Sequence, residues 1–375
     1  MSKGFGIVQF FAFWVRSLFW SVNMLLAFYT LLAYWLLRSL FIEHWLAGMI
    51  MISIPVVWVF NLLCSIVWLF YRPWRALLSG LVVLVGVVML QNRTFVWHTP
   101  TVAAGPAVKL FSYNVQSFNV DSRYDDATRL PLVKDAVDYV IGYDAPIKCL
   151  QEVVNITDGP GHDFVGRMKA AGYAYSIVLF PEGTRKPNGN VGMAIYSRYP
   201  IVNSDHAHFS GDNGILWANI KVGNDTIRVI NVHLHSMGIR VGKVLKQQEI
   251  TGVKHETRGV LSALRQGFIM RAEQVRQVER HVMESEFPVL VTGDHNDTPY
   301  SVVYEHMRRL LPNSFEGEGR GFGFTYNRAP GFIRIDHQFH DPRLPVLNFE
   351  TLNTVRYSDH YPIAGTYQLP GKRVR

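Results

Sequence analysis

The chain has 375 residues, of which 49% are hydrophobic and 13% aromatic, enough for one large core and further apolar segments. Its formal net charge is +8, yet residues 1–93 carry six Lys/Arg residues against one acidic residue, Glu43. Much of the positive charge therefore flanks apolar sequence, which argues against a basic nucleic-acid-binding face as its origin. The spacing of the two cysteines, Cys64 and Cys149, excludes a disulfide framework and a cysteine zinc site.

Three uncharged runs near the N-terminus predict membrane-spanning helices, since about 20 apolar residues cross a bilayer. The runs are Leu18–Leu37, Leu46–Tyr71 and Ala76–Leu90. Pro55 lies inside the second run and is expected to kink it. A signal peptide does not fit, because the apolar sequence continues too far and no clear cleavage site follows. We therefore expect an all-α transmembrane anchor of about three helices over residues 1–97, with the lipid bilayer as partner and no obligate protein partner evident.

The basic residues around these runs predict an orientation in the membrane. Three spans place the two ends of the anchor on opposite sides. Lys3, Arg16, Arg72 and Arg75 would share one side, and Arg38 and Arg93 the other. The more basic side faces the cytoplasm, so the N-terminus is expected there. The prediction is an integral protein of a bacterial inner membrane whose C-terminal domain lies outside the cytoplasm.

Residues 98–107 are predicted to be a linker, and residues 108–375 a separate α/β domain. Apolar runs predict strands at 108–113, 146–150, 192–201, 215–222, 226–232, 288–292 and 332–335. The Gly223-Asn224-Asp225 turn joins two of these strands as a hairpin. Helical spacing predicts helices at 130–141, 260–282 and 302–311, and residues 237–256 are expected to leave the core as a polar excursion.

The strand at 288–292 leads directly into Gly293, Asp294, His295 and Asn296. A carboxylate and an amide two residues apart, at the end of a buried strand, are the oxygen ligands that a hard cation such as Mg²⁺ prefers. The same residue types also form ordinary Asx turns, so the stretch alone leaves both interpretations open.

Other apolar segments lead into polar residues in the same way: Asn114, Glu152, His233, Asp336 and the pair Asp359-His360. Each of these residues alone could be a turn residue, a solvated strand end, a helix cap or a packed core side chain. Together the carboxylates, amides and imidazoles supply a metal site, a base and a phosphate clamp. In layered α/β proteins such residues gather at one edge of the sheets, so we expect them to form one site.

Seven separated motifs make the chain from about residue 109 to 369 resemble the endonuclease/exonuclease/phosphatase superfamily. They are FSYNVQSFN, LQEV, GMAIYSRYPI, INVHLHS, VTGDHNDTP, IRID and YSDHYPI, in the order typical of that superfamily. Its members include deoxyribonuclease I, abasic-site endonucleases, neutral sphingomyelinases and inositol-polyphosphate 5-phosphatases. The resemblance implies a four-layer α/β sandwich, in which two mixed β-sheets pack together between outer helices.

The resemblance also implies a role for each site residue. Glu152 would be a metal ligand for Mg²⁺ or Mn²⁺, with Asn114 close by and Asp359 completing the metal site. Asp294 would orient or activate the attacking water, and Asn296 would hold the phosphate. His233 would contact a phosphate oxygen, and His360 would act on the phosphate or as a general base, oriented by Asp336.

Two positions depart from the pattern of the superfamily. His295 stands where an aromatic or apolar residue is usual, and Asp336 is followed by His337, Gln338, Phe339 and His340. Both departures are expected to place additional imidazoles near the site.

The expected function is a membrane-anchored, Mg²⁺-dependent phosphoesterase that hydrolyses phosphodiester or phosphomonoester bonds in a nucleic acid or a lipid headgroup. The near-neutral soluble part argues against tight binding of a nucleic-acid duplex, and tethering beside a bilayer suits a lipid. One alternative is a lipid-headgroup phosphodiesterase of the neutral-sphingomyelinase type. Another is a catalytically silent binding domain, and transport is disfavoured because the spans contain no charged pair.

Overall fold

The computed structural model describes residues 6–40, 44–101, 105–119, 130–154, 163–181, 185–186, 189–236, 250–328 and 331–371. The chain divides into two compact units. The first comprises Met1–Gln91 with Tyr300–Val302, and the second comprises Asn92–Pro299 with Val303–Arg375.

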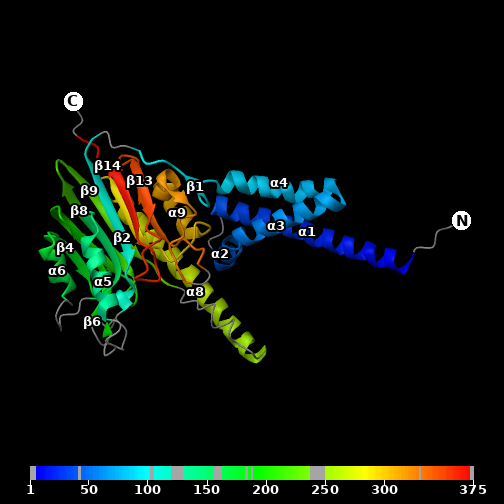
Figure 1. Ribbon diagram of the computed structural model, residues 1–375, viewed down its shortest axis with the longest axis horizontal. Coiled ribbons are helices and arrows are strands. Elements are labelled where there is room, and N and C mark those ends of the chain that lie inside the picture. The colour runs from blue at the N-terminus through cyan, green and yellow to red at the C-terminus, as the bar shows by residue number, and fades with distance from the viewer. Residues whose placement is uncertain are drawn as a thin grey trace. The chain divides into compact units, whose positions relative to one another are not determined.

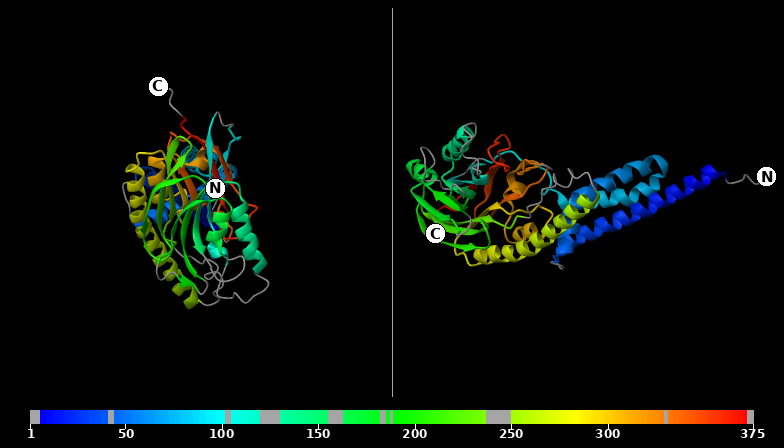
Figure 2. Two further views of the ribbon diagram at one scale, coloured as in Figure 1. Left: turned by 90° about the vertical axis from the view of Figure 1, so that its left-hand side faces the viewer. Right: turned by 90° about the horizontal axis from the view of Figure 1, so that it is seen from below.

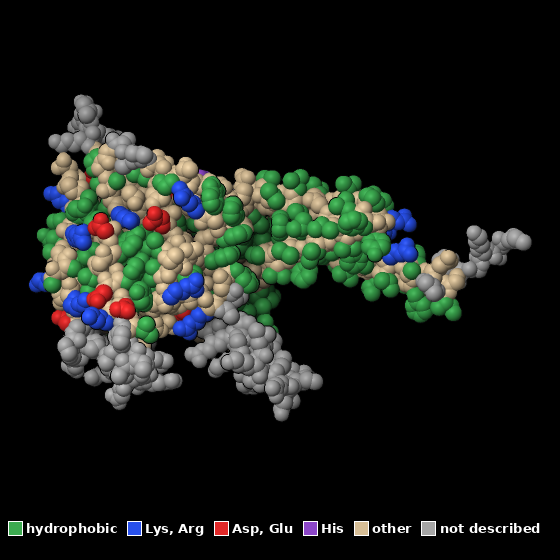
Figure 3. Space-filling model, viewed as in Figure 1, with side chains coloured by type: hydrophobic (Ala, Val, Ile, Leu, Met, Phe, Trp, Pro, Cys, Tyr) green, Lys and Arg blue, Asp and Glu red, His purple; other side chains and the backbone are tan. Residues whose placement is uncertain are grey.

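The first unit is helical (Figure 1). Its helices are α1 Ile7–Ser39, α2 Trp45–Ile52, α3 Ile54–Tyr71 and α4 Pro73–Leu90. Three helical segments are long and apolar enough to cross a membrane: Gln9–Ser39, Ile54–Tyr71 and Pro73–Leu90. Instead of kinking one helix, Pro55 lies in the first turn of α3, where its missing N–H costs no helical hydrogen bond. The face of these helices seen in Figure 3 is covered almost entirely by hydrophobic side chains.

Polar side chains connect the helices of the first unit. The Asn23 amide donates to Ser79 Oγ at 2.5 Å and accepts from Trp68 Nε1 at 2.7 Å. The Asn61 amide donates to Thr30 Oγ1 at 2.9 Å. Between apolar helices such hydrogen bonds favour one packing arrangement over others, because an unpaired polar group would be costly.

The second unit contains two mixed β-sheets. The five-stranded sheet has the order β12-β10-β9-β8-β7. Its strands are β7 Ile201–His208, β8 Gly214–Val222, β9 Asp225–His233, β10 Val289–Asp294 and β12 Asp336–His340. The seven-stranded sheet has the order β13-β14-β2-β3-β6-β4, with β5 paired to β6. Its strands are β2 Ala107–Asn114, β3 Ile147–Val154, β4 Tyr175–Leu179, β5 Arg185–Lys186, β6 Gly189–Ser197, β13 Val346–Thr351 and β14 Ile363–Gln368.

Apolar side chains fill the three spaces between four layers. Leu110 and Ile147 of one sheet meet Leu216 of the other in the central core. Val275 of α8 Ile250–Met283 packs on the outer face of the five-stranded sheet, and Val137 of α5 Leu130–Gly142 packs on the outer face of the seven-stranded sheet. Figure 2 shows the two sheets between these helices. The expected four-layer α/β sandwich with preceding apolar helices is confirmed. The remaining helices are η1 Gln116–Asn119, α6 Phe164–Ala170, α9 Val302–Leu310 and α10 Ser314–Glu318.

One predicted strand is displaced in the structure. The sequence predicts a strand at 332–335 that ends on Asp336, but β12 begins at Asp336. Asp336 still reaches the expected edge of the sheet, because β12 runs antiparallel to β10. A residue that starts β12 therefore lies beside the residue that ends β10. Similarly, Asp359 and His360 precede β14, which is antiparallel to β2.

The segment after α4 is built into the second unit. Arg93 is buried and its guanidinium lies 2.6 Å from the carboxylate of Glu305. β1 Val96–Trp97 pairs with β11 Arg320–Gly321, and the Thr101 N–H donates to Leu347 O at 2.8 Å. Part of the predicted linker, residues 102–104, lies outside the described residues. The predicted excursion at 237–256 lies outside them up to residue 249, and α8 begins at Ile250.

Candidate active site

The ends of five strands bring the predicted site residues to one edge of the two sheets. Asp294 at the end of β10 is paired in register with His233 at the end of parallel β9 and with Asp336 at the start of antiparallel β12. In the other sheet, Asn114 at the end of β2 is paired with Gln151, the neighbour of Glu152 on β3. The sheet pairing itself therefore places these polar side chains close together.

Three residues at this edge have unusual backbone conformations with positive φ. Gly293 has φ 133°, and a Cβ there would lie 2.1 Å from Val232 O, so only glycine fits. Glu152 and Asn296 adopt positive φ values of 52° and 50°. The left-handed conformation costs a non-glycine residue roughly 1–2 kcal/mol, and such outliers cluster at functional sites. The conformations of Glu152 and Asn296 are consistent with selection for function.

Asn114 connects the two sheets at the centre of the site. Its Nδ2 donates to Glu152 Oε1 and to Asp294 Oδ2, each at 3.0 Å. Two carboxylates from different sheets therefore converge on one buried amide. Burial raises the pKa of both Glu152 and Asp294 above their usual values, although nearby histidines oppose the shift. Such a pair is costly to keep ionised without a compensating positive charge.

His360 and Asp336 form the shortest contact between charged side chains of the site. His360 Nδ1 lies 2.8 Å from Asp336 Oδ2, and His360 Nε2 lies 3.7 Å from Asp294 Oδ2. Burial alone would lower the pKa of His360, but the carboxylates of Asp336 and Asp294 outweigh it and raise the pKa to about 10. The imidazole is therefore cationic near neutral pH and can donate a hydrogen bond to an anion.

His233 also approaches Asp294 Oδ2, the oxygen that His360 approaches. Its Nε2 is 3.8 Å from Asp294 Oδ2 and 4.0 Å from Glu152 Oε1, and its Nδ1 lies 3.2 Å from Asp212 O. Burial lowers the pKa of His233, but the carboxylates of Asp212, Asp294 and Glu152 reverse the shift and raise it. Two imidazoles with raised pKa values thus lie beside the Asp294 carboxylate.

Asn296 contacts Asp294 through its backbone, and the side chains of Asn296 and Asp359 contact other residues. The Asn296 N–H donates to Asp294 Oδ1 at 2.8 Å, and its Nδ2 donates to Leu234 O at 2.9 Å. Asp359 Oδ2 accepts from Gln116 Nε2 at 3.2 Å and lies 3.6 Å from Arg328 Nε. Through the Gln116 N–H, which donates to Asn114 Oδ1 at 3.0 Å, Asp359 is joined indirectly to Asn114.

Within the described residues, Asp294, Asp336 and His360 form a group whose ligand atoms all lie within 4.8 Å of one another. Two of these three residues, Asp336 and His360, already form a hydrogen bond with each other, which uses one ligand atom of each. Glu152 Oε1 and Asp294 Oδ2 instead converge on Asn114 Nδ2, while Asn114 Oδ1 accepts from the Gln116 N–H. Oxygen-rich donors with raised carboxylate pKa values fit a hard divalent cation.

The additional imidazoles lie in an aromatic cluster rather than among the residues that converge on Asn114. The rings of His295 and His337 are 5.3 Å apart, and both contact Phe339. Burial lowers the pKa of His295 to about 4 and that of His337 well below its usual value. Both are buried side chains beside the site, since His295 follows Asp294 and His337 is paired in register with Gly293, but neither is among the residues that converge on Asn114.

Sequence reasoning missed three contributors to the site. Gln116 belongs to the motif FSYNVQSFN but was assigned no role, and its side chain contacts Asp359. Asp212 holds His233 from the loop before β8, and Arg328 approaches Asp359 and Gln116 from the loop after Tyr326. The sequence offers one clue to Arg328, which lies shortly before the IRID motif. Asp212 lies in none of the seven motifs, so the sequence gives no clue to its role.

Comparison with known proteins identifies the fold family. Residues 111–360 match the Endonuclease/Exonuclease/phosphatase family. The chain belongs to this family. Residues 16–93 match a domain of unknown function, and a comparison with curated proteins finds no match.

Solved structures of the endonuclease/exonuclease/phosphatase family are similar to this chain at low identity. A family protein from Beutenbergia cavernae is 18% identical, with a TM-score of 0.48 over 72% of this chain and 74% of that one. The human nocturnin catalytic domain with bound sulfate is 17% identical, with a TM-score of 0.49 over 71% and 95%. A family protein from Bacteroides vulgatus is 17% identical, with a TM-score of 0.49 over 71% and 100%.

As a member of the endonuclease/exonuclease/phosphatase family, the chain is a phosphoric ester hydrolase. The family generally uses a divalent metal, and the acidic and imidazole side chains described above offer a possible site for one. This confirms the enzyme class expected from the motifs.

Proposed function

We propose that the protein is a membrane-anchored, Mg²⁺-dependent phosphodiesterase. The observation that carries the chemistry is the convergence of Glu152 and Asp294 on Asn114, each at 3.0 Å, between two histidines with raised pKa values. Three helical segments with the length and apolarity of membrane spans support the anchor. The same geometry would serve a phosphomonoester, so the experiment below includes both classes.

The proposed metal ligands are Glu152 and Asn114, with Asp359 as the more distant member predicted from sequence. A bound Mg²⁺ would offset charge on the phosphoryl oxygens and assist activation of water. Asp294 is the proposed proton acceptor, because burial raises its pKa and a more basic carboxylate takes a proton from water more readily.

Two histidines are proposed to hold the phosphoryl group. Protonated His360 would donate from Nε2 to a phosphoryl oxygen while Asp336 holds its Nδ1. His233 would donate from Nε2 on the other side, with its Nδ1 held by Asp212 O. Asn296 would supply an additional donor for the phosphate, if its amide exchanged Leu234 O for the substrate. Hydrogen bonds from charged donors to an anion are stronger than neutral ones.

The substrate is proposed to be a lipid headgroup phosphodiester in preference to a nucleic-acid duplex. A site tethered next to a bilayer meets lipid headgroups at high effective concentration. Residues 94–375 carry 31 basic and 28 acidic residues, so this part lacks the excess positive charge that binding duplex phosphates requires. A nuclease is the second candidate and an arm of the test.

The test is a substrate panel on the full-length protein in detergent with Mg²⁺ or Mn²⁺. It includes sphingomyelin, glycerophospholipids, inositol phosphates, single- and double-stranded DNA, RNA, and a chromogenic phosphodiester and phosphomonoester. We expect turnover of at least one phosphodiester, its loss in excess chelator and its return with Mg²⁺. Asp294→Asn is the matched inactive control. Full activity in chelator would contradict the metal requirement, and no turnover of any ester would favour the binding-domain alternative.

A further inference from the structure

The end of the helical unit where α3 leads into α4 carries a cluster of tryptophans around an arginine. The guanidinium carbon of Arg75 lies 4.8 Å from the ring centroids of Trp20 and Trp68 and 5.3 Å from that of Trp74. Each contact is within the range of a cation–π interaction. Arg75 Nε is buried and has no hydrogen-bond partner in the described part of the chain. The three tryptophan rings therefore surround the Arg75 guanidinium, whose Nε–H makes no hydrogen bond to the described residues.

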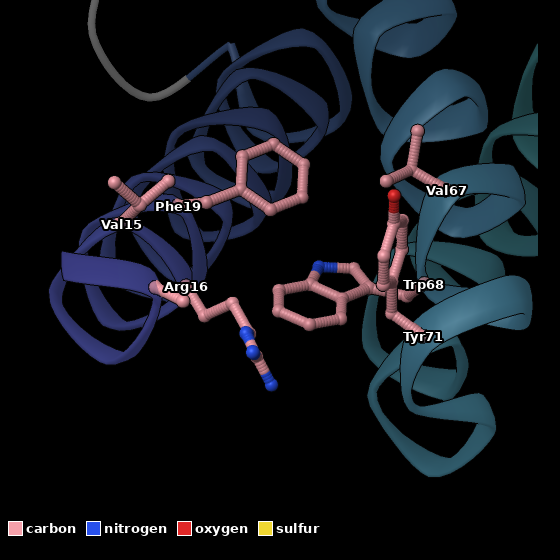
Figure 4. A pocket seen from close by; sticks show the side chains of 7 residues that line it. Val15, Arg16, Phe19, Val67, Trp68 and Tyr71 are labelled. Carbon is pink, nitrogen blue, oxygen red and sulfur yellow. The ribbon is translucent and has the colours of Figure 1, made fainter. Parts of the chain in front are cut away.

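A cavity of about 270 Å³ lies between α1 and α3, and Trp68 is one of its lining residues. It is lined by Ala12, Val15, Arg16, Phe19, Val67, Trp68 and Tyr71. Figure 4 shows Phe19 and Trp68 on its two sides and the Arg16 side chain extending along its edge toward Trp68. The Phe19 and Trp68 ring centroids are 5.2 Å apart. The cavity thus combines an apolar wall with one exposed cation.

Among the described residues of this unit, no side-chain carboxylate is available to pair with Arg16 or Arg75. Residues 1–91 contain a single acidic residue, Glu43, which follows the C-terminal end of α1. Arg16 lies in the N-terminal half of α1, 23 residue steps or roughly 35 Å of helix before its last residue, Ser39. The described residues of the helical unit therefore leave both guanidinium groups without a carboxylate partner.

We propose that this cavity binds an anionic phospholipid of the bilayer, with its phosphate on Arg16 and one acyl chain against Phe19, Val67 and Trp68. Arg75, whose guanidinium lies 4.8 Å from the Trp68 ring centroid, does not line the cavity and adds positive charge nearby. Arginine suits this role because its planar guanidinium can bind a phosphate through two hydrogen bonds. Tryptophan and tyrosine side chains are enriched at the headgroup level of membranes, which fits the position of Tyr71.

The inference rests on the membrane insertion included in the proposed function. It adds a lipid site that is separate from the catalytic residues, because every lining residue belongs to α1 or α3. The two proposals can therefore fail independently.

The test measures lipid binding to the full-length protein in detergent by native mass spectrometry. Phosphatidylglycerol and phosphatidylcholine with the same acyl chains are titrated separately, and inorganic phosphate is a third arm. We expect phosphatidylglycerol to bind at least tenfold more tightly than phosphatidylcholine, since each nearby arginine contributes about fivefold toward an anionic lipid. Inorganic phosphate should bind weakly, because it lacks the chain that fills the cavity.

Three variants separate a specific site from general surface charge. Arg16→Gln should reduce phosphatidylglycerol binding about fivefold or more, toward the affinity for phosphatidylcholine. Arg72→Gln removes the same charge at the same end from an exposed residue that does not line the cavity, and should change binding little. Val67→Trp retains every charge but fills the cavity, and should weaken both lipids. The melting temperature of each variant verifies that it is folded.

Equal affinity for the two lipids would overturn the proposed site. Equal losses in Arg16→Gln and Arg72→Gln would also overturn it, because they would indicate a diffuse charge effect. Unchanged binding in folded Val67→Trp would remove the acyl chain from the cavity. Flotation with phosphatidylcholine vesicles and turnover of the substrate panel are measured in parallel. Loss of flotation would contradict the membrane anchor, and loss of turnover would contradict the catalytic proposal.

Discussion

Asp336 and His360 approach each other from β12 and from the loop before β14, and their hydrogen bond is 2.8 Å long. If they act as one unit on the phosphoryl group, His360→Ala should lower turnover by roughly two to four powers of ten. Asp336→Asn should also impair turnover, because the imidazole loses the carboxylate that orients it. The double variant should be little slower than His360→Ala alone, since residues that act together are not additive.

This prediction is tested by measuring turnover and melting temperature for the three variants. Strictly additive losses in turnover would contradict a shared role. If His360 were only a packed side chain, the variants would melt earlier while turnover per folded molecule stayed nearly unchanged.

The charge state of His360 is a second prediction at the residue scale. Its pKa is raised from the usual 6.5 to about 10, although burial opposes the shift, because Asp336 and Asp294 stabilise the protonated ring. Titration of the metal-free protein by NMR should therefore find His360 still protonated at pH 8. Asp336→Asn should lower its pKa. A pKa near 6.5 in the unsubstituted protein would contradict this electrostatic picture.

The same shift has a consequence for stability. A group whose pKa is higher in the folded state stabilises the fold most at a pH below its unfolded pKa. The contribution of His360 should therefore be complete below about pH 6.5 and be lost progressively as the pH rises toward 10. Urea unfolding of the metal-free protein should show a steeper fall in stability over this range for the unsubstituted protein than for His360→Ala.

The sequence predicts the residue types of the site better than their contacts. Asn114, Glu152, His233 and Asp294 each follow an apolar strand, and this pattern is visible without a structure. The contact of Arg328 with Asp359 depends on how a loop folds over the sheet edge, and no local pattern encodes it. The ring contacts of His295 with His337 and Phe339 likewise depend on which strands become neighbours, and this cannot be seen in the sequence.

At the scale of elements, α8 holds the loop that carries Asp294 and Asn296. Arg271 of α8 is fully buried, and its Nε lies 3.0 Å from Asp297 Oδ2. Arg271 Nη1 also donates to His235 O at 3.1 Å, and His337 Nε2 lies 2.9 Å from Asp297 O. A single buried ion pair therefore connects a helix, two strand ends and the loop between the site residues and α9.

Arg271→Met should lower the free energy of unfolding by about 3–5 kcal/mol, because it leaves a buried carboxylate without its partner. The matched control is Arg343→Met, which removes a half-exposed arginine from Asp341 and should cost at most about 1 kcal/mol. Adding Asp297→Leu to Arg271→Met should recover part of the loss. Urea unfolding checks all three, and equal costs for the two arginines would contradict the role of burial.

The sequence does not predict the direction in which β12 pairs with its neighbour. The apolar run at 332–335 predicts a strand, but hydrogen bonding to β10 begins only at Asp336. Periodicity along one chain does not reveal which partner a strand will meet or in which direction. The hairpin of β8 and β9 was predictable because its Gly223-Asn224-Asp225 turn is local, and Gly223 has the positive φ that the turn requires.

At the scale of the whole molecule, the buried Arg93 predicts where an independent catalytic fragment must begin. Arg93 pairs with Glu305, its carbonyl accepts from Arg334 Nη2 at 2.6 Å, and Val96 packs against Phe315. A fragment of residues 92–375 should therefore have a higher melting temperature than one of residues 108–375. Arg93→Met in the longer fragment should account for part of the difference. Equal melting temperatures would show that the segment before β2 contributes nothing to folding.

The lengths of the helices predict a membrane topology for the chain. With 8 residues, α2 is only about 12 Å long and cannot cross a bilayer alone, so α1, α3 and α4 are the three candidate crossings. An odd number of crossings places the N-terminus and the catalytic unit on opposite sides. Lys3, Arg16, Arg72 and Arg75 outnumber Arg38 and Arg93, which favours a cytoplasmic N-terminus.

The resulting prediction is that the catalytic unit lies outside the cytoplasm. In bacterial cells, alkaline phosphatase fused to the C-terminus should be active, and green fluorescent protein fused there should be dark. Replacing Arg72 and Arg75 by Gln while adding two Lys residues after Arg38 should weaken or invert this pattern, because it shifts the basic residues to the other side. An inactive phosphatase fusion with a fluorescent partner fusion in the unsubstituted chain would mean an even number of crossings or the opposite orientation. The anionic lipid would then lie in the opposite leaflet, since Arg16 and Arg75 would face the other side of the membrane.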